Sequence, residues 1–214
     1  LKPKKTKNIQ LLLTFSGSYL LAITILHLIP ELFNQDLVGI PYGISIYILI
    51  GFILQILLEY FSQGIEHGHL HKTNIIPFSV LISLCLHAIL ESVPLGVEHA
   101  HHETQNVLLT GIVLHKIPVA VVLMTLFLES GMKKKQAYLL LLIFSIMSPL
   151  GVYFGDMLSE FSYQLRAIVI GIFLHISTTI LFESTDGHKF SAQKIIMIVI
   201  ASTLAILSLW HENL

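Results

Sequence analysis

Apolar residues in this chain gather into long runs that are separated by charged or turn-forming residues. A window of about 20 residues, the helical length that crosses the hydrocarbon of a bilayer, finds seven such runs. They cover residues 11–30, 41–61, 75–97, 106–128, 137–154, 166–182 and 194–210. Each run is too long and too uniformly apolar for a tilted barrel strand, which needs only about 9 to 11 alternating residues. The pattern predicts an all-α, polytopic transmembrane helix bundle with seven visible spans.

The composition agrees with a membrane protein. Hydrophobic residues make up 54% of the 214 residues and charged residues 12%, which is too apolar for a soluble domain. We therefore expect a single transmembrane domain over residues 1–214, with the lipid bilayer as its surroundings. The formal net charge of -1 gives no sign of nucleic-acid binding. The one cysteine, Cys85, excludes a disulfide framework and a thiolate metal site within the chain.

Basic residues indicate the orientation. If the seven spans alternate in direction, ten lysines fall on one side and Arg166 alone on the other. These ten are Lys2, Lys4, Lys5, Lys7, Lys72, Lys133, Lys134, Lys135, Lys189 and Lys194. Cytoplasmic loops carry the excess of Lys and Arg, so we expect the lysine-rich side in the cytoplasm, the C-terminus outside, and the plasma membrane as the location.

The chain does not begin with Met, and its first apolar run could be mistaken for a secretory signal. That run of about 20 residues is longer than a signal h-region, and no A-x-A-like cleavage site follows it. We interpret it as a true span.

Ionisable residues lie inside two neighbouring runs. His87 and Glu91 are four apart, so on a helix they project from one face about one turn apart. If the turn between the runs centres near His101, then His87 and His115 each lie fourteen residues from it. An antiparallel hairpin then places both imidazoles about 21 Å from the turn, near mid-membrane. Buried ionisable groups of this kind mark ion or substrate pathways, so these residues are candidate metal ligands.

Other polar residues could extend this site. His175 lies nine residues into its run from Arg166, as His115 lies nine into its run from Asn106, so His175 is a further candidate ligand at the same depth. The alternative for His175, and for Glu59, is a hydrogen bond to a neighbouring helix. His27 and Glu31, at the outer end of the first run, are candidates for an entrance.

Two polar segments between runs are rich in histidine and acids, a composition that gathers Zn²⁺ weakly; solvated turns are the alternative. The segment 64–72, expected in the cytoplasm, contains His67, His69 and His71. The segment 98–103, expected outside, contains His99, His101 and His102. Pro94 and Pro118 lie close to the candidate ligands and predict kinks there.

The motifs resemble those of the ZIP family of divalent metal transporters. HAILESVPLG (87–96) is similar to the family's fourth-helix signature, and HKIPVA (115–120) to its fifth. HLIPE (27–31) and SPLG (148–151) fit its second and sixth helices. The resemblance implies eight helices, of which the first is missing from this chain, and a transport site formed by His87, Glu91 and His115.

Four positions depart from the family pattern. Ala88 stands where Asn or Ser is common, Ser92 where Gly is usual, and Val119 where a metal-binding Glu is frequent. Lys116 occupies the place of an acid that bridges two metals in some members, and its ammonium could replace the second cation. We therefore predict a mononuclear site, with His175 or water completing the coordination.

The expected function is inward transport of a divalent cation across the cytoplasmic membrane. Zn²⁺ is the expected ion because imidazole and carboxylate suit it; Fe²⁺, Mn²⁺ and Cd²⁺ are the alternatives. We expect no enzymatic activity and no prosthetic group, and a homodimer remains open. The competing interpretations are a seven-span, zinc-dependent membrane hydrolase, in which the histidines would activate water, and a metal sensor that does not transport.

Overall fold

The computed structural model describes residues 2–34, 43–62, 78–96, 102–183 and 191–212. Within these ranges the chain is helical and contains no strand. Seven of the described helices are long and apolar enough to cross a membrane, over residues 8–34, 43–62, 79–96, 105–129, 134–157, 159–182 and 192–209. These ranges overlap the seven predicted runs one for one. The prediction of an all-α, polytopic bundle is confirmed.

The helices follow one another with short irregular turns. The first span contains α1 (Lys2–Ile23), a π-helical turn η1 (Thr24–Leu28) and α2 (Ile29–Asn34). The next spans are α3 (Gly43–Ser62), then α4 (Phe78–Ser92) with the 3₁₀ turn η3 (Val93–Gly96), then α5 (His102–Glu129). The last are α6 (Lys134–Met157), the 3₁₀ turn η4 (Ser159–Phe161), α7 (Ser162–Glu183) and α8 (Ala192–Glu212).

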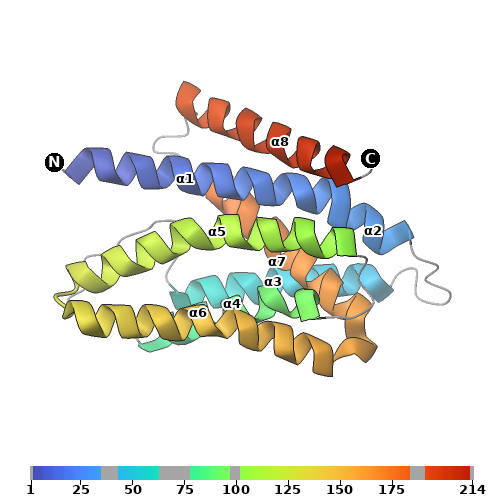
Figure 1. Ribbon diagram of the computed structural model, residues 1–214, viewed down its shortest axis with the longest axis horizontal. Helices are drawn as coiled ribbons and strands as arrows, with labels where there is room; N and C mark the ends of the chain where they lie inside the picture. Colours follow the sequence, from blue (N-terminus) through green and yellow to red (C-terminus); the bar gives the residue numbers. More distant parts are fainter. Residues whose placement is uncertain (1, 35–42, 63–77, 97–101, 184–190, 213–214) are drawn as a thin grey trace.

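The helices lie side by side and alternate in direction along the long axis of the molecule (Figure 1). The most buried spans are those of α7 and α1, at 67% and 61%, whereas those of α6 and α8 are each 17% buried. α7 packs against α3 and α1, α1 packs against α5 and α8, and α4 packs against α3 and α6. The centre of the bundle is therefore formed by α1 and α7, while α6 and α8 turn most of their apolar side chains outward.

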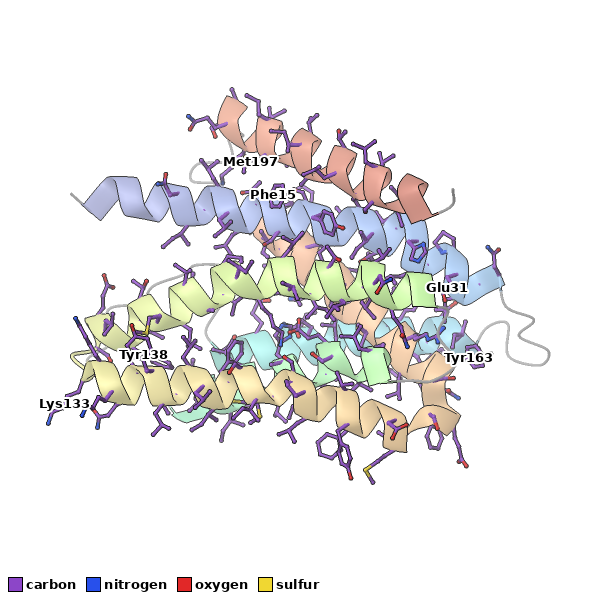
Figure 2. All side chains as sticks on the ribbon, viewed as in Figure 1. Phe15, Glu31, Lys133, Tyr138, Tyr163 and Met197 are labelled. Atoms are coloured by element: carbon purple, nitrogen blue, oxygen red, sulfur yellow. The ribbon has the colours of Figure 1, made fainter. Side chains whose placement is uncertain are left out.

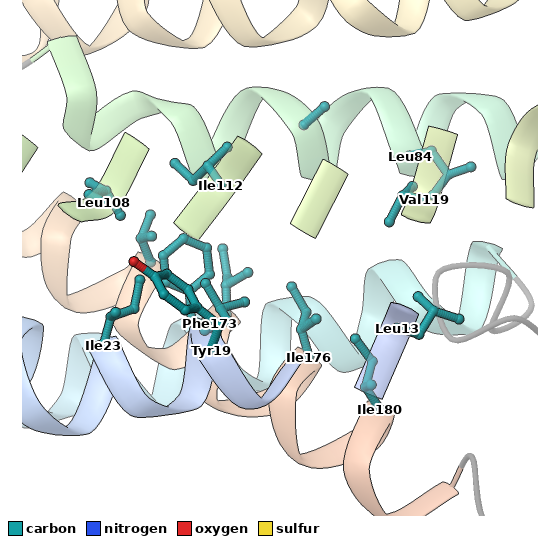
Figure 3. Packing of buried hydrophobic residues seen from close by; sticks show 14 of the residues in the cluster. Leu13, Tyr19, Ile23, Leu84, Leu108, Ile112, Val119, Phe173, Ile176 and Ile180 are labelled. Atoms are coloured by element: carbon teal, nitrogen blue, oxygen red, sulfur yellow. The ribbon is translucent and has the colours of Figure 1, made fainter. Parts of the chain in front are cut away.

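A continuous apolar core fixes the depth of α4 and α5. Figure 3 shows Leu84 of α4 and Val119 of α5 facing each other above Leu13 of α1 and Ile180 of α7. Leu84, Leu13 and Ile180 are fully buried, and Val119 is nearly so. Close packing of this kind leaves little freedom for one helix to slide along another. The polar residues carried by α4 and α5 are therefore held at one level.

The two prolines have different effects. Pro94 lies in η3, where α4 gives way to a 3₁₀ turn, so the predicted distortion near this residue is confirmed. Pro118 lies inside α5, which continues as a helix from His102 to Glu129 and is visibly curved (Figure 1). Because proline has no backbone N–H, residue 118 donates no hydrogen bond to the Leu114 carbonyl. Packing of α5 on both sides of this residue preserves the helix.

Candidate metal site

Three predicted ligands come together between α4 and α5. One ligand atom from each of His87, Glu91 and His115 lies within 4.8 Å of the other two. Each of these residues is only 1% exposed. On α4, Nε2 of His87 lies 3.4 Å from Oε2 of Glu91. The imidazole rings of His87 and His115 have centroids 6.1 Å apart and are nearly perpendicular. The hairpin argument from sequence therefore placed these two histidines correctly.

Local sequence explains why these side chains converge. The four-residue spacing in HAILE puts His87 and Glu91 on one face of α4. The residues between them include Ala88, which is fully buried in the apolar core on another face. α5 supplies His115 from the opposite side, and the following Lys116 reaches the same carboxylate. Polar groups from two helices thus meet within the apolar core.

A third helix orients His87. Nδ1 of His87 lies 3.1 Å from Oε1 of Gln55 on α3, and Gln55 is fully buried. Because an amide oxygen only accepts hydrogen bonds, Nδ1 carries the proton and donates. In a neutral imidazole the lone pair then belongs to Nε2, the atom that faces Glu91. An outer hydrogen bond of this kind is how proteins orient a ligating histidine.

Lys116 is part of the same cluster. Its Nζ lies 2.8 Å from Oε1 of Glu91 and donates a hydrogen bond to Oγ of Ser148 on α6. The ammonium also lies 5.6 Å from the centroid of the Phe144 ring, within the range of a cation–π contact. The Glu91 carboxylate therefore has a histidine near one oxygen and a lysine at the other. The Lys116 ammonium thus lies beside the candidate metal site, where the sequence predicted it.

The donor set suits a borderline divalent cation. Two imidazoles and one carboxylate form the three-ligand set that zinc sites use when they keep a fourth position open. Ligation needs a lone pair on each imidazole and an ionised carboxylate. Polar groups that are buried in this way are costly unless they are paired or bind a metal ion. The cluster can therefore hold one ion that exchanges at the open position.

His175 lies apart from this cluster. Its Nε2 is hydrogen-bonded to Oε2 of Glu59 on α3, and its ring makes an edge contact with Phe52 at a centroid distance of 5.0 Å. Oγ1 of Thr179 lies 3.5 Å from the same ring nitrogen. His175 therefore does not reach the three candidate ligands, although the sequence predicted the same depth for it. Its hydrogen bond to Glu59 joins α7 to α3, which is the alternative stated from the sequence.

The end of the bundle that contains His27 and Glu31 has an ion pair that the sequence did not predict. Nε2 of His27 lies 4.0 Å from Oε2 of Glu31, and Oε1 of Glu31 lies 3.4 Å from a guanidinium nitrogen of Arg166. Glu31 and Arg166 line a small pocket together with Pro94 and Gln105. The two proposed entrance residues are thus adjacent, but a basic side chain occupies one oxygen of Glu31.

The histidine-rich segments contribute little structural information. His67, His69, His71, His99 and His101 lie outside the described residues, and His102 begins α5. Sequence reasoning missed the contacts of Gln55 and Ser148 with the cluster. A glutamine in the middle of the apolar run 41–61 was the available signal for Gln55, whereas Ser148 is an ordinary residue for a membrane helix.

A family model described as ZIP Zinc transporter matches residues 62–208, which is more than half of the chain. The matched region runs from the end of α3 into α8 and includes His87, Glu91 and His115. A search of curated proteins finds no match.

Proposed function

Since the chain belongs to the ZIP zinc transporter family, a family of integral membrane transporters of divalent metal ions, we propose that His87, Glu91 and His115 form its transport site and that the ion is Zn²⁺. The observation that carries this proposal is the convergence of the three candidate ligand atoms within 4.8 Å of one another at a buried position between α4 and α5. Buried ionisable groups in a membrane are costly and mark ion pathways.

The chemistry of the ligands supports zinc. Imidazole is a favoured ligand of Zn²⁺, and a single carboxylate adds charge without closing the coordination shell. Val119 is 2% exposed and supplies no ligand atom, and His175 is engaged with Glu59. Water is therefore our candidate for the fourth ligand. Fe²⁺, Mn²⁺ and Cd²⁺ compete for the same donor set.

We propose that the site binds one ion. Oε1 of Glu91 already faces the Lys116 ammonium at 2.8 Å. A second divalent cation bridged by this oxygen would have to displace that ammonium, and like charges at such a distance repel strongly where water does not screen them. The position of Lys116 thus supports a mononuclear site.

The direction of transport is proposed to be inward, with the lysine-rich end in the cytoplasm. Lys133 lies at one end of the molecule, and Glu31 and Tyr163 lie at the other (Figure 2). The basic end is the cytoplasmic one by the positive-inside rule, and we assign the plasma membrane on the same ground.

A hydrolase or a sensor would use the same ligands differently. A hydrolase has to admit a substrate to the metal-bound water. The three candidate ligands here are each 1% exposed. This burial favours access by a metal ion over access by a larger substrate. A sensor would change conformation on binding metal but produce no flux. Both alternatives therefore predict no accumulation of metal.

The experiment is ⁶⁵Zn uptake by intact cells that express the chain. We expect His87→Ala and His115→Ala each to abolish accumulation, because each removes one of three protein ligands. Thr110→Val is the control on α5, since the Thr110 hydroxyl bonds only its own helix at the Asn106 carbonyl among the described contacts. Wild-type uptake by either histidine variant, at equal expression, would refute the site.

A further inference from the structure

Lys116 of α5 is held in place by groups from two other helices. It extends from α5, contacts Glu91 of α4 through its ammonium, and donates to Ser148 of α6. Its side chain is 19% exposed, whereas Glu91 is 1% exposed. Because Ser148 also bonds the ammonium, Lys116 keeps a defined position even when a metal ion engages the Glu91 carboxylate.

The ammonium changes the charge that an arriving ion meets. The carboxylate of Glu91 carries one negative charge and Lys116 one positive charge, so the pair is neutral when no metal is bound. In the interior of the bundle these charges are screened far less than in water. A divalent cation therefore binds here with a less favourable electrostatic free energy than at an identical site without the lysine.

The contacts of Lys116 keep its ammonium close to the candidate ligands. Nζ faces Oε1 of Glu91 and donates to Ser148, whereas Oε2 of Glu91 faces His87. An ion held by Oε2 and the two histidines would therefore have the ammonium beside it and be repelled by it.

Resting on the proposed function, we propose that Lys116 is a positioning residue that sets the affinity of the transport site. Its ammonium competes with the transported ion for Glu91 and keeps binding weak enough for the ion to leave. Conduction through a membrane protein requires binding that is favourable enough for entry and weak enough for release. Two histidines and an unopposed carboxylate would hold Zn²⁺ tightly; the lysine counteracts this.

The test measures Zn²⁺ binding by equilibrium dialysis of ⁶⁵Zn with the full chain in detergent, and uptake kinetics in proteoliposomes. Lys116→Met keeps the length and removes the charge. We expect it to bind Zn²⁺ at least about tenfold more tightly, the factor that corresponds to about 1.4 kcal/mol. Its KM and its maximal uptake rate should both fall, because release becomes slower.

Lys116→Arg keeps the charge and is the matched control. We expect its dissociation constant and its maximal rate to lie closer to those of the wild type than the values for Lys116→Met, because the competing cation is retained. A purely structural role predicts weaker binding and a raised KM in the methionine variant. If Lys116→Met does not fold, Lys116→Gln replaces it, since the amide can still bond Glu91 and Ser148.

Unchanged or weaker Zn²⁺ binding by the folded neutral variants would overturn the inference. The His115→Ala chain separates this outcome from failure of the proposed function. If His115→Ala loses binding while Lys116→Met does not tighten it, the site stands and the role of Lys116 is wrong. If His115→Ala binds like the wild type, the site itself is wrong.

Discussion

At the scale of single residues, the geometry of the site depends on a buried amide from a third helix. Gln55 accepts the hydrogen bond from Nδ1 of His87, which leaves the lone pair of a neutral ring on Nε2, the atom proposed to bind the metal. Glu91 is placed by its spacing from His87, but the His87 ring could rotate without an outer partner. Gln55 thus connects the packing of α3 to the chemistry of α4.

We expect Gln55→Leu to weaken Zn²⁺ binding by about 10-fold to 100-fold, the usual cost of losing an outer partner of a metal ligand. The leucine leaves the ring of His87 without its acceptor while filling a similar volume. Equilibrium dialysis of the purified chain measures the effect. Thr110→Val is the control, because it removes a polar group from α5 away from these contacts. Equal affinities for the two variants would contradict the role of Gln55.

The clustering of His87, Glu91 and His115 could be predicted from the sequence because their spacing carries the information. His87 and Glu91 share a helical face by number alone, and His115 follows from the symmetry of the hairpin. The Gln55 contact required the register of α3 against α4, which depends on tertiary packing between segments separated by 63–77. His175 shows the same limit, since equal depth says nothing about which way a side chain faces.

At the scale of elements, the close approach of helices decides the architecture. A Cβ at Gly51 of α3 would collide with the backbone carbonyl of Ile168 on α7, and one at Gly171 of α7 with the carbonyl of Ile48. The two helices are therefore in backbone contact at both levels. Membrane helices use small residues for such contacts because packing, rather than hydrophobicity, holds them together. α3 then presents Gln55 toward α4 from a fixed position.

Gly51→Ala is expected to destabilise the protein by roughly 1–3 kcal/mol, as overpacking of a well-packed interior does. Gly111→Ala on α5 is the matched control, since its added Cβ meets the flexible end of the Ile23 side chain rather than backbone. The two variants are compared by thermal unfolding in detergent, in which the amount of protein that stays monodisperse is measured at each temperature. A transition temperature for Gly51→Ala at or above that of Gly111→Ala would refute the close contact.

Apolar patterning predicted the existence and approximate limits of these helices but not their neighbours. A run such as 137–154 is similar in composition to 166–182, yet α6 lies at the periphery and α7 at the centre. The difference lies in which faces meet, and that depends on small residues and on side-chain shape across helices. These contacts join residues far apart in sequence, so no local pattern encodes them.

At the scale of the whole molecule, the alternation of the helices gathers the lysine-rich ends together. Lys133 and the start of α8 lie at the end where α1 begins, and η4 lies at the other (Figure 1 and Figure 2). The cluster of His87, Glu91 and His115 lies near the middle of the spans of α4 and α5. In the proposed function an ion would pass this cluster, and the orientation of the two ends would set the direction of transport.

Cysteines placed at the start of α6 and in η4, which follows the other end of α6, test that orientation. In a Cys85→Ser background we expect Glu160→Cys to react with a membrane-impermeant maleimide in intact cells. Lys134→Cys should react only after permeabilisation, because both positions are exposed but lie at opposite ends. Labelling of Lys134→Cys in intact cells would reverse the assignment.

The most direct measurement of the central claim is anomalous X-ray scattering at the zinc edge from crystals of the full chain soaked in Zn²⁺. We predict one peak between α4 and α5, at about 2.0–2.2 Å from a nitrogen of His87, a nitrogen of His115 and an oxygen of Glu91. Lys116 should remain beside that carboxylate. Saturating Zn²⁺ with no density at these three residues would contradict the account, and a second peak bridged by Glu91 would contradict the single-ion site.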